Sequence, residues 1–317
     1  MSLFLLKRIL TMAITLLVAT VVVFLVLEIL PGDPASFMLG MEAQEDTLSA
    51  LRAQMGLDQP ALVRYFKWVL GLLSGDLGIS YTYDVPVSEL IIERIFVSLP
   101  LAILAIVLST VIAIPLGVIA ASRHNKSSDL IIMGFSQLGI AIPNFWFAML
   151  LTIVFAVMLR WLPAGGFAGW DAGFFPALTS LLLPTVSLAL PQSAILARVT
   201  RSAVLEVIQE DYIRTARAKG VSRGSALWNH ALRNAMIPVV TIMGLQFSFL
   251  LAGTIIIENV FYLPGIGRLI FQAISQRDLI VVKDLVILLS AAVIIINFIV
   301  DVLYAVIDPR LRGSGHA

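Results

Sequence analysis

The sequence has 317 residues, of which 59% are hydrophobic and only 13% are charged, and its mean hydropathy is +0.98. Soluble domains carry about 25% charged residues, so a chain of this composition cannot keep its whole surface in water. The net charge of +1 gives no reason to expect nucleic acid as a partner, and the absence of cysteine excludes disulfides, thiolate metal sites and cysteine nucleophiles. We predict an all-α membrane protein.

Six apolar runs are long enough to cross a bilayer, because about 20 apolar residues span its hydrocarbon core. The first, Ile9 to Leu30, is too long for the core of a signal peptide, so we expect a retained helix. Pro143 interrupts the over-long third run and is expected to kink or shorten it. The other runs lie at about 101–121, 130–159, 176–197, 236–257 and 285–307.

The longest polar stretch, residues 31–100, follows the first span. We expect an extracytoplasmic loop with helices near 45–55, 60–74 and 86–98, separated by glycine and proline. The predicted organisation is therefore an amino-terminal tip and first span (1–30), this loop (31–100), a five-helix core (101–307) that contains a cytoplasmic loop (201–236), and a cytoplasmic tail (308–317).

Basic residues predict the orientation of the chain. With the amino terminus in the cytoplasm, the inner segments hold 13 Lys and Arg against 5 Asp and Glu, whereas the outer segments hold 8 against 13. Cytoplasmic loops carry the excess of Lys and Arg, so both termini are predicted to be cytoplasmic. The short loop at 122–129 and the basic segment at 198–233 support this orientation without the long loop.

The segment from Glu210 to Pro238 holds the most informative pattern. The apolar positions follow helical spacing at Val204, Val207, Ile208, Tyr212 and Ala216, which predicts one helix to Lys219 that ends with Gly220 as a left-handed cap. Ser222 can cap a second helix before Pro238 leads into the fifth span. The result is a helix, a tight turn and a helix on the cytoplasmic face. From composition alone, an ordinary basic loop lying on anionic lipid explains this segment equally well.

The same segment resembles the EAA loop of binding-protein-dependent ABC importer permeases. Ala216, Gly220 and Leu232 match the general pattern. The run Tyr212-Ile213-Arg214-Thr215-Ala216-Arg217-Ala218-Lys219-Gly220 is similar to the version in the dipeptide, oligopeptide and nickel permease family. Further similarity to the first-type permease subunit of that family lies at Leu30-Pro31-Gly32-Asp33-Pro34, Ile142-Pro143-Asn144-Phe145-Trp146, Leu263-Pro264-Gly265-Ile266-Gly267-Arg268 and Asp308-Pro309-Arg310.

This resemblance implies a type I ABC importer permease of about six spans, which forms half of a translocation pathway. The implied partners are a second similar permease, two cytoplasmic ABC ATPase subunits and an external solute-binding protein, in the inner membrane of a bacterial or archaeal cell. The loop would dock into the ATPase through Tyr212, Arg214, Thr215, Ala216, Arg217, Ala218, Lys219, Gly220 and Leu232. The implied cargo is a di- or oligopeptide, with nickel or its chelates, glutathione and oligosaccharides as alternatives.

We do not expect an enzyme. The sequence has no G-x-x-x-x-G-K-[ST] phosphate loop, so ATP is expected on the partner subunits and no cofactor on this chain. It also has no H-E-x-x-H motif, and His124, His230 and His316 are scattered, so no metal site is predicted.

Polar residues inside the spans are the candidates for a pathway. Glu28 and Asp301 are expected to be the only acidic residues within spans, each close enough to a span end to reach the interface. Gln192, Gln246 and Asn297 are candidate pathway-lining residues, with hydrogen bonding between helices as the equal alternative. The rival function is an ion-coupled secondary transporter or channel that works without an ATPase. That class favours deeply buried charges and an internal repeat, and neither is evident.

Overall fold

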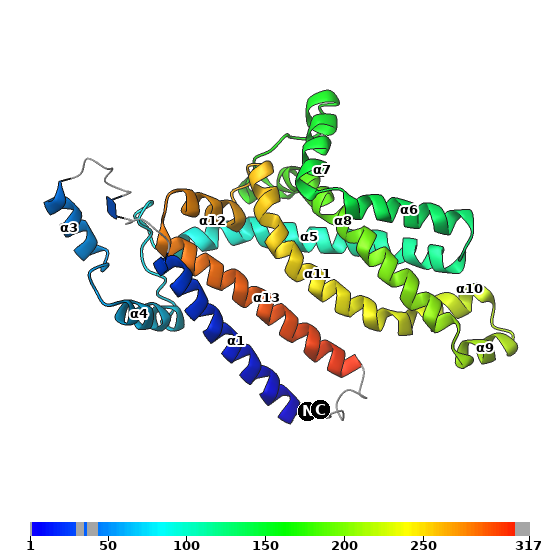
Figure 1. Cartoon of the computed structure of the whole chain (residues 1–317). Helices are drawn as coiled ribbons and strands as arrows, with labels where there is room; N and C mark the ends of the chain where they lie inside the picture. Colours follow the sequence, from blue (N-terminus) through cyan, green and yellow to red (C-terminus); the bar gives the residue numbers. More distant parts are fainter. Residues whose placement is uncertain (1, 30–34, 37–43, 308–317) are drawn as a thin grey trace.

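The computed structural model describes residues 2–29, 35–36 and 44–307, and helices dominate this part of the chain (Figure 1). Its one pairing of extended backbone is an isolated bridge between Ile79 and Pro86. The predicted tail at 308–317 and the motifs at 30–34 and 308–310 lie outside the described residues. The elements are α1 (Ser2–Ile29), α3 (Glu45–Gln54), α4 (Ala61–Ser74), α5 (Val87–Ser122), α6 (Ser127–Ala141), α7 (Asn144–Leu151), the π-helix η1 (Thr152–Met158), the 3₁₀ turn η2 (Trp170–Ala172), α8 (Phe174–Ile208), α9 (Asp211–Ala218), α10 (Arg223–Ser225), the π-helix η3 (Ala226–Ala231), α11 (Leu232–Val260), α12 (Ile266–Ser275) and α13 (Leu279–Ile307).

The membrane helices confirm the predicted count of about six spans. Within the described residues, five helices are long and apolar enough to cross a bilayer, and a sixth span forms if a bent pair is counted as one. That pair consists of α6 followed by α7 and η1, and the helix direction bends by 101° between them. The break falls at Ile142 and Pro143, which are both extended. Proline cannot donate the next helical hydrogen bond and disfavours helical backbone in the residue before it, so the predicted kink at Pro143 is confirmed.

The loop at 31–100 contains α3 and α4 close to their predicted positions, but the third predicted helix does not end at residue 98. It continues as α5 to Ser122, so the prediction of a separate helix near 86–98 is wrong. Pro100 lacks the N–H that would bond to the Phe96 carbonyl. The indole Nε1 of Trp170 donates to that oxygen instead, at 2.8 Å. A distant side chain thus satisfies the acceptor and lets the helix pass through the proline.

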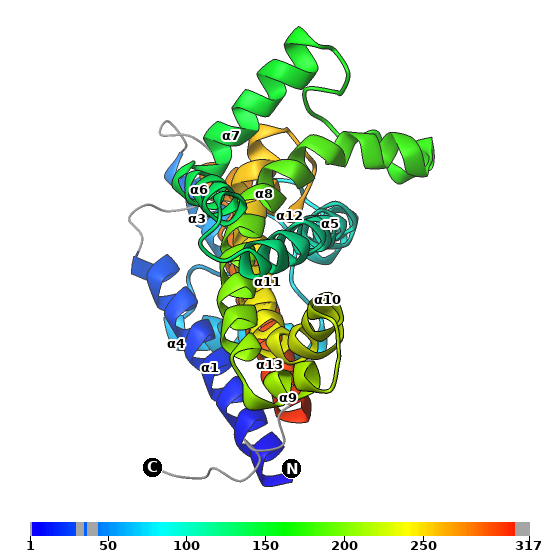
Figure 2. The same cartoon turned by 90° about the vertical axis from the view of Figure 1, so that its right-hand side faces the viewer.

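The helices are arranged around the pair α5 and α8, which make the most extensive contact of any two elements described. α11 packs on α8, α13 packs on α11, and α1 lies against α13, at the periphery (Figure 1). The helix hairpin of α9, α10 and η3 projects from the end of α8 and α11 that lies away from α12. Figure 2 shows the same hairpin below the crossing of α5 and α8.

α5 and α8 are in close contact at Gly117. A Cβ atom at Gly117 would lie 2.6 Å from Cβ of Thr200 and 2.7 Å from the carbonyl oxygen of Ala197. Membrane helices associate through van der Waals packing because lipid tails are as apolar as their side chains, and small residues allow that approach. Gly117 therefore sets the distance between the two central helices.

We predict that Gly117→Ala destabilises the protein by about 1–3 kcal/mol, because the added methyl group overlaps α8 and forces the helices apart. Thermal unfolding of the purified protein in detergent measures the effect. Gly134→Ala in α6 is the matched control, since a Cβ there meets no atom within 4 Å. Equal unfolding midpoints for the two variants would contradict the proposed close contact.

Candidate functional site

The candidate site is the helix hairpin formed by α9, α10 and η3. α8 ends at Ile208, and Glu210 adopts extended backbone before α9 begins at Asp211. The single helix predicted from Val204 to Lys219 is therefore wrong, because the chain turns at Gln209 and Glu210. The turn also changes the face that is buried: Ile213 is 2% exposed, whereas Tyr212 is exposed.

The turn after α9 has the predicted left-handed glycine. Gly220 has a φ of +91°, and its N–H donates to the Arg217 carbonyl at 3.0 Å. The N–H of Val221 donates to the Ala216 carbonyl at 3.2 Å. This pair of bonds is a Schellman motif, which satisfies the last carbonyls of a helix and requires a left-handed residue. The turn therefore holds the two limbs of the hairpin at a defined angle.

Ser222 caps the second limb as predicted. Its Oγ accepts a hydrogen bond from the N–H of Ser225 at 3.3 Å, in the geometry of a helix N-cap. The second limb then continues without a gap through η3 into α11, so Pro238 lies inside the helix rather than at its start. The hairpin is consequently joined directly to a membrane-spanning helix at each end.

The predicted docking residues separate into two groups. Leu232, the first residue of α11, packs against the apolar cluster that includes Ala121, Val204 and Val239, so it lies among α5, α8 and α11 rather than on the hairpin. Ala216 is half-buried. The remaining predicted docking residues are exposed and form the outer surface of the hairpin: Tyr212, Arg214, Thr215, Arg217, Ala218, Lys219 and Gly220.

This outer surface is basic. Arg214 lies 3.4 Å from the carboxylate of Asp211, one turn earlier, and both side chains are largely exposed. Arg217 also lines a cavity of about 490 Å³ between the hairpin and the ends of α5 and α8. The described residues around that cavity include Arg123 and His124 but no acidic side chain. The surface is therefore suited to an acidic protein partner.

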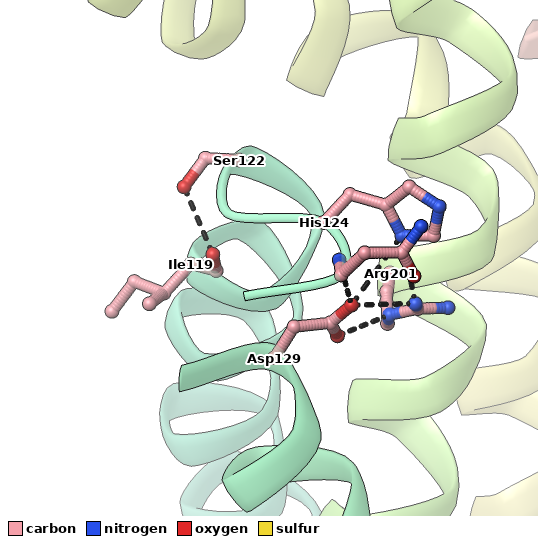
Figure 3. A network of polar contacts seen from close by, with 6 residues as sticks. Ile119, Ser122, His124, Asp129 and Arg201 are labelled. Atoms are coloured by element: carbon pink, nitrogen blue, oxygen red, sulfur yellow. Dashed lines mark hydrogen bonds and ion pairs between the residues drawn. The ribbon is translucent and has the colours of Figure 1, made fainter. Parts of the chain in front are cut away.

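An ion pair joins α6 to the part of α8 that precedes the hairpin (Figure 3). Arg201 in α8 donates from Nε to Oδ1 of Asp129 at 2.6 Å and from Nη2 to Oδ2 at 2.7 Å. Asp129 is 1% exposed, and its Oδ2 also accepts the Asn125 N–H. Arg201 Nη2 lies 3.0 Å from His124 Nδ1, which acts as the acceptor because a guanidinium only donates. The network ties α5, α6 and α8 together.

The candidate pathway residues make hydrogen bonds between helices. Gln246 is 4% exposed, and its Nε2 donates to the Gln192 carbonyl at 3.0 Å, joining α11 to α8. Ser248 Oγ lies 3.3 Å from Oδ1 of Asn297, which joins α11 to α13. Gln192 is half-buried. The alternative of interhelical bonding therefore holds for Gln246 and Asn297, and a pathway role for the three residues stays a prediction.

The structure contradicts the expectation that Glu28 and Asp301 are the only acidic residues within spans. α11 and α13 extend beyond the predicted apolar runs and include Glu258 and Asp284. Glu258 is fully buried, accepting from Ser98 Oγ at 2.5 Å and from the Arg268 N–H at 3.2 Å. The spans were predicted as uninterrupted apolar runs, and such a run ends at the first charged residue. This criterion therefore missed carboxylates that lie inside a helix and are stabilised there by hydrogen bonds.

The expected interfacial acids both form ion pairs. Glu28 pairs with Arg64 of α4, and Asp301 lies 3.0 Å from Arg8 of α1. These contacts join α1 to α4 near one end and to α13 near the other. Across the described part of the chain, no group of three or more His, Asp or Glu side chains is arranged to hold a metal ion.

Comparison with known proteins identifies relatives over nearly the whole chain. A family model described as binding-protein-dependent transport system inner membrane component matches residues 113–313, and a model of the amino-terminal part of such components matches residues 1–102. A putative peptide transport system permease protein of Brucella abortus is 42% identical over 312 residues, covering 98% of this chain and 99% of that one. The glutathione transport system permease protein GsiC of Salmonella paratyphi A is 42% identical over 309 residues, or 98% of each chain.

Solved structures agree on the fold. A chain of the inward-facing MetNI methionine ABC transporter, 17% identical, superposes with a TM-score of 0.58 over 70% of this chain and 97% of that one. This likeness supports the all-α architecture predicted from the sequence. The family models and the relatives favour an ABC importer permease over an ion-coupled transporter or channel. The chain therefore belongs to the family of binding-protein-dependent transport system inner membrane components, the membrane permeases of ABC importers, which are transport subunits rather than enzymes.

Proposed function

We propose that this chain forms half of the translocation pathway of an ATP-driven importer. Its partners are a second similar permease, two cytoplasmic ABC ATPase subunits that bind the ATP, and a solute-binding protein outside the membrane. The observation that carries this proposal is the hairpin of α9, α10 and η3. Its exposed basic surface suits docking, and its two ends continue into α8 and α11. Movement imposed on the hairpin by an ATPase would reach both helices directly.

The cargo that the relatives support best is a short peptide. Two of the proteins compared above are named for transport of peptides and of glutathione, itself a tripeptide, and a probable peptide ABC transporter permease of Sinorhizobium fredii is 37% identical over 98% of this chain. We propose that the solute-binding protein does most of the selecting. The loop at 31–100 and the turn near Pro264 are the surfaces proposed to receive it.

The proposed orientation has both termini in the cytoplasm of a bacterial or archaeal cell. In this orientation the basic hairpin lies on the same side of the membrane as Arg123 and Lys126 of the loop after α5, as the distribution of Lys and Arg favours. The hairpin thereby faces the compartment that contains ATP.

Replacing Gly220 with valine is predicted to uncouple transport from ATP hydrolysis. A side chain at Gly220 meets no atom within 4 Å, so the cost is backbone strain of about 1–2 kcal/mol in the left-handed turn rather than a clash. The measurement is co-purification of the ATPase subunits together with substrate-stimulated ATP hydrolysis.

Two controls isolate the backbone conformation as the cause. Gly220→Asn keeps the left-handed turn accessible and is expected to retain most coupling. Gly224→Ala adds a side chain to the same hairpin in equally open space but at a residue without positive φ, and is expected to be neutral. Wild-type coupling in Gly220→Val would show that the hairpin is not the docking element.

Charge reversal at Arg217 is predicted to weaken ATPase docking through loss of attraction to an acidic partner surface. Wild-type docking is expected to weaken as salt rises from about 0.1 M to about 1 M, where screening lengths fall from about 10 Å to about 3 Å. Arg217→Glu should bind less at low salt and respond less to added salt. Lys126→Glu, an equally exposed reversal in the neighbouring loop, is the control. If both reversals act alike, the effect is general charge rather than docking.

Reporter fusions test the orientation. A reporter joined after Asp58, in the loop between α3 and α4, is expected to lie outside the cytoplasm. A reporter joined at the carboxyl terminus is expected to lie inside it. A cytoplasmic signal from the fusion after Asp58 would reverse the topology.

A further inference from the structure

α4 has an apolar stripe that no described part of the chain covers. Leu62, Phe66, Leu70 and Leu73 are 72%, 60%, 64% and 81% exposed. Their spacing of four, four and three residues places them on one face of the helix. An exposed stripe of large apolar side chains marks a surface that meets lipid or protein rather than water.

The other faces of α4 are polar or anchored. Arg64, Lys67 and Gly71 line a cavity of about 350 Å³ between α4, α1 and α13. Trp68 is 8% exposed and donates from Nε1 to Oδ1 of Asp284 in α13 at 2.6 Å. The helix therefore has the segregated faces, with basic residues opposite leucine and phenylalanine, that interfacial helices use.

The contacts of α4 with α1 fix its depth. Tyr65 Oη lies 3.0 Å from Oγ1 of Thr20, and the Tyr65 and Trp68 rings contact Phe24 with centroids 5.4 and 6.3 Å away. Thr20 is nine positions before the end of α1 at Ile29, which is about 14 Å along a helix. One leaflet of the hydrocarbon core is about 15 Å thick. Since α1 spans the membrane, the Tyr65 hydroxyl lies within the hydrocarbon leaflet rather than in the water above it.

We propose that α4 is an interfacial helix embedded in the leaflet that surrounds the carboxyl-terminal end of α1, with its leucine and phenylalanine stripe in contact with lipid acyl chains. With 14 residues, α4 is about 21 Å long and too short to cross the core. α1, on which α4 packs, also exposes large apolar side chains, among them Val18, Val22 and Leu25. Arg64 and Lys67 then lie away from the acyl chains, on the side of the cavity that α4 shares with α1 and α13.

This proposal assigns the stripe to the bilayer rather than to a receptor. The cluster of Tyr65 and Trp68 is of the aromatic kind that anchors helices at membrane interfaces. A solute-binding protein approaches from water and cannot reach a surface inside the leaflet. The proposal requires only that α1 spans the membrane, so it does not depend on the orientation of the chain or on the hairpin as a docking element.

Site-directed spin labelling tests the depth of α4. The chain has no cysteine, so a single introduced cysteine carries the only label on this subunit. Labels at Phe66→Cys and Leu73→Cys are placed in the full-length chain, assembled with its partner subunits in nanodiscs of phosphatidylethanolamine and phosphatidylglycerol. Power saturation then compares collision with oxygen, which concentrates in acyl chains, and with an aqueous nickel chelate. Val22→Cys in α1 is the lipid control, and Ala50→Cys in α3 and Lys67→Cys on the polar face of α4 are the aqueous controls.

We expect the labels at Phe66 and Leu73 to favour oxygen several-fold, as at Val22, and the labels at Ala50 and Lys67 to favour the nickel chelate. Preference for the chelate at Phe66 and Leu73 would overturn the proposal. If these labels then lost access to the chelate when the solute-binding protein was added, the stripe would be a receptor surface instead. Poor access to both reagents would also overturn it, because another subunit would then cover the stripe.

Discussion

The structure depends on the close contact of α5 with α8. Gly117 lets the two backbones meet at Thr200, and the next residue of α8, Arg201, thereby comes into reach of Asp129. Asp129 in α6 is buried, so loss of its arginine partner would leave the carboxylate uncompensated and destabilise the contact of α6 with α8. The remaining membrane helices pack outward from this pair, and the hairpin that carries the exposed basic surface begins ten residues beyond Arg201.

The parts of the fold that could be predicted from sequence are those that local chemistry determines. A bilayer requires long apolar helices, so the spans were visible as runs of residues. Pro143 lacks an N–H and the chain bends there, whatever the neighbouring helices do. Gly220 and Ser222 form a helix end and a helix start through bonds to residues within four positions, and both assignments agree with the structure.

The parts that could not be predicted depend on partners far away in the sequence. α5 passes through Pro100 because Trp170 bonds to the Phe96 carbonyl, a contact that spacing does not indicate. Glu258 remains in α11 because Ser98 and the backbone of the first turn of α12 surround its carboxyl group. The face of α9 was misplaced for a different reason: the extended backbone of Glu210 interrupts the helical spacing, so Ile213 takes the buried position that this spacing gave to Tyr212.

The continuity of the second limb with α11 has a mechanical consequence. From Ala226 to Val260 the chain is one helical rod about 50 Å long, with the hairpin at one end and Glu258 at the other. The Glu258 carboxyl group accepts the Arg268 N–H and so holds the start of α12, and a Cβ at Gly265 would lie 2.3 Å from Cδ of Glu258. The rod can therefore act as a lever: a tilt about its contacts with α8 would move the hairpin in one direction and α12 in the other.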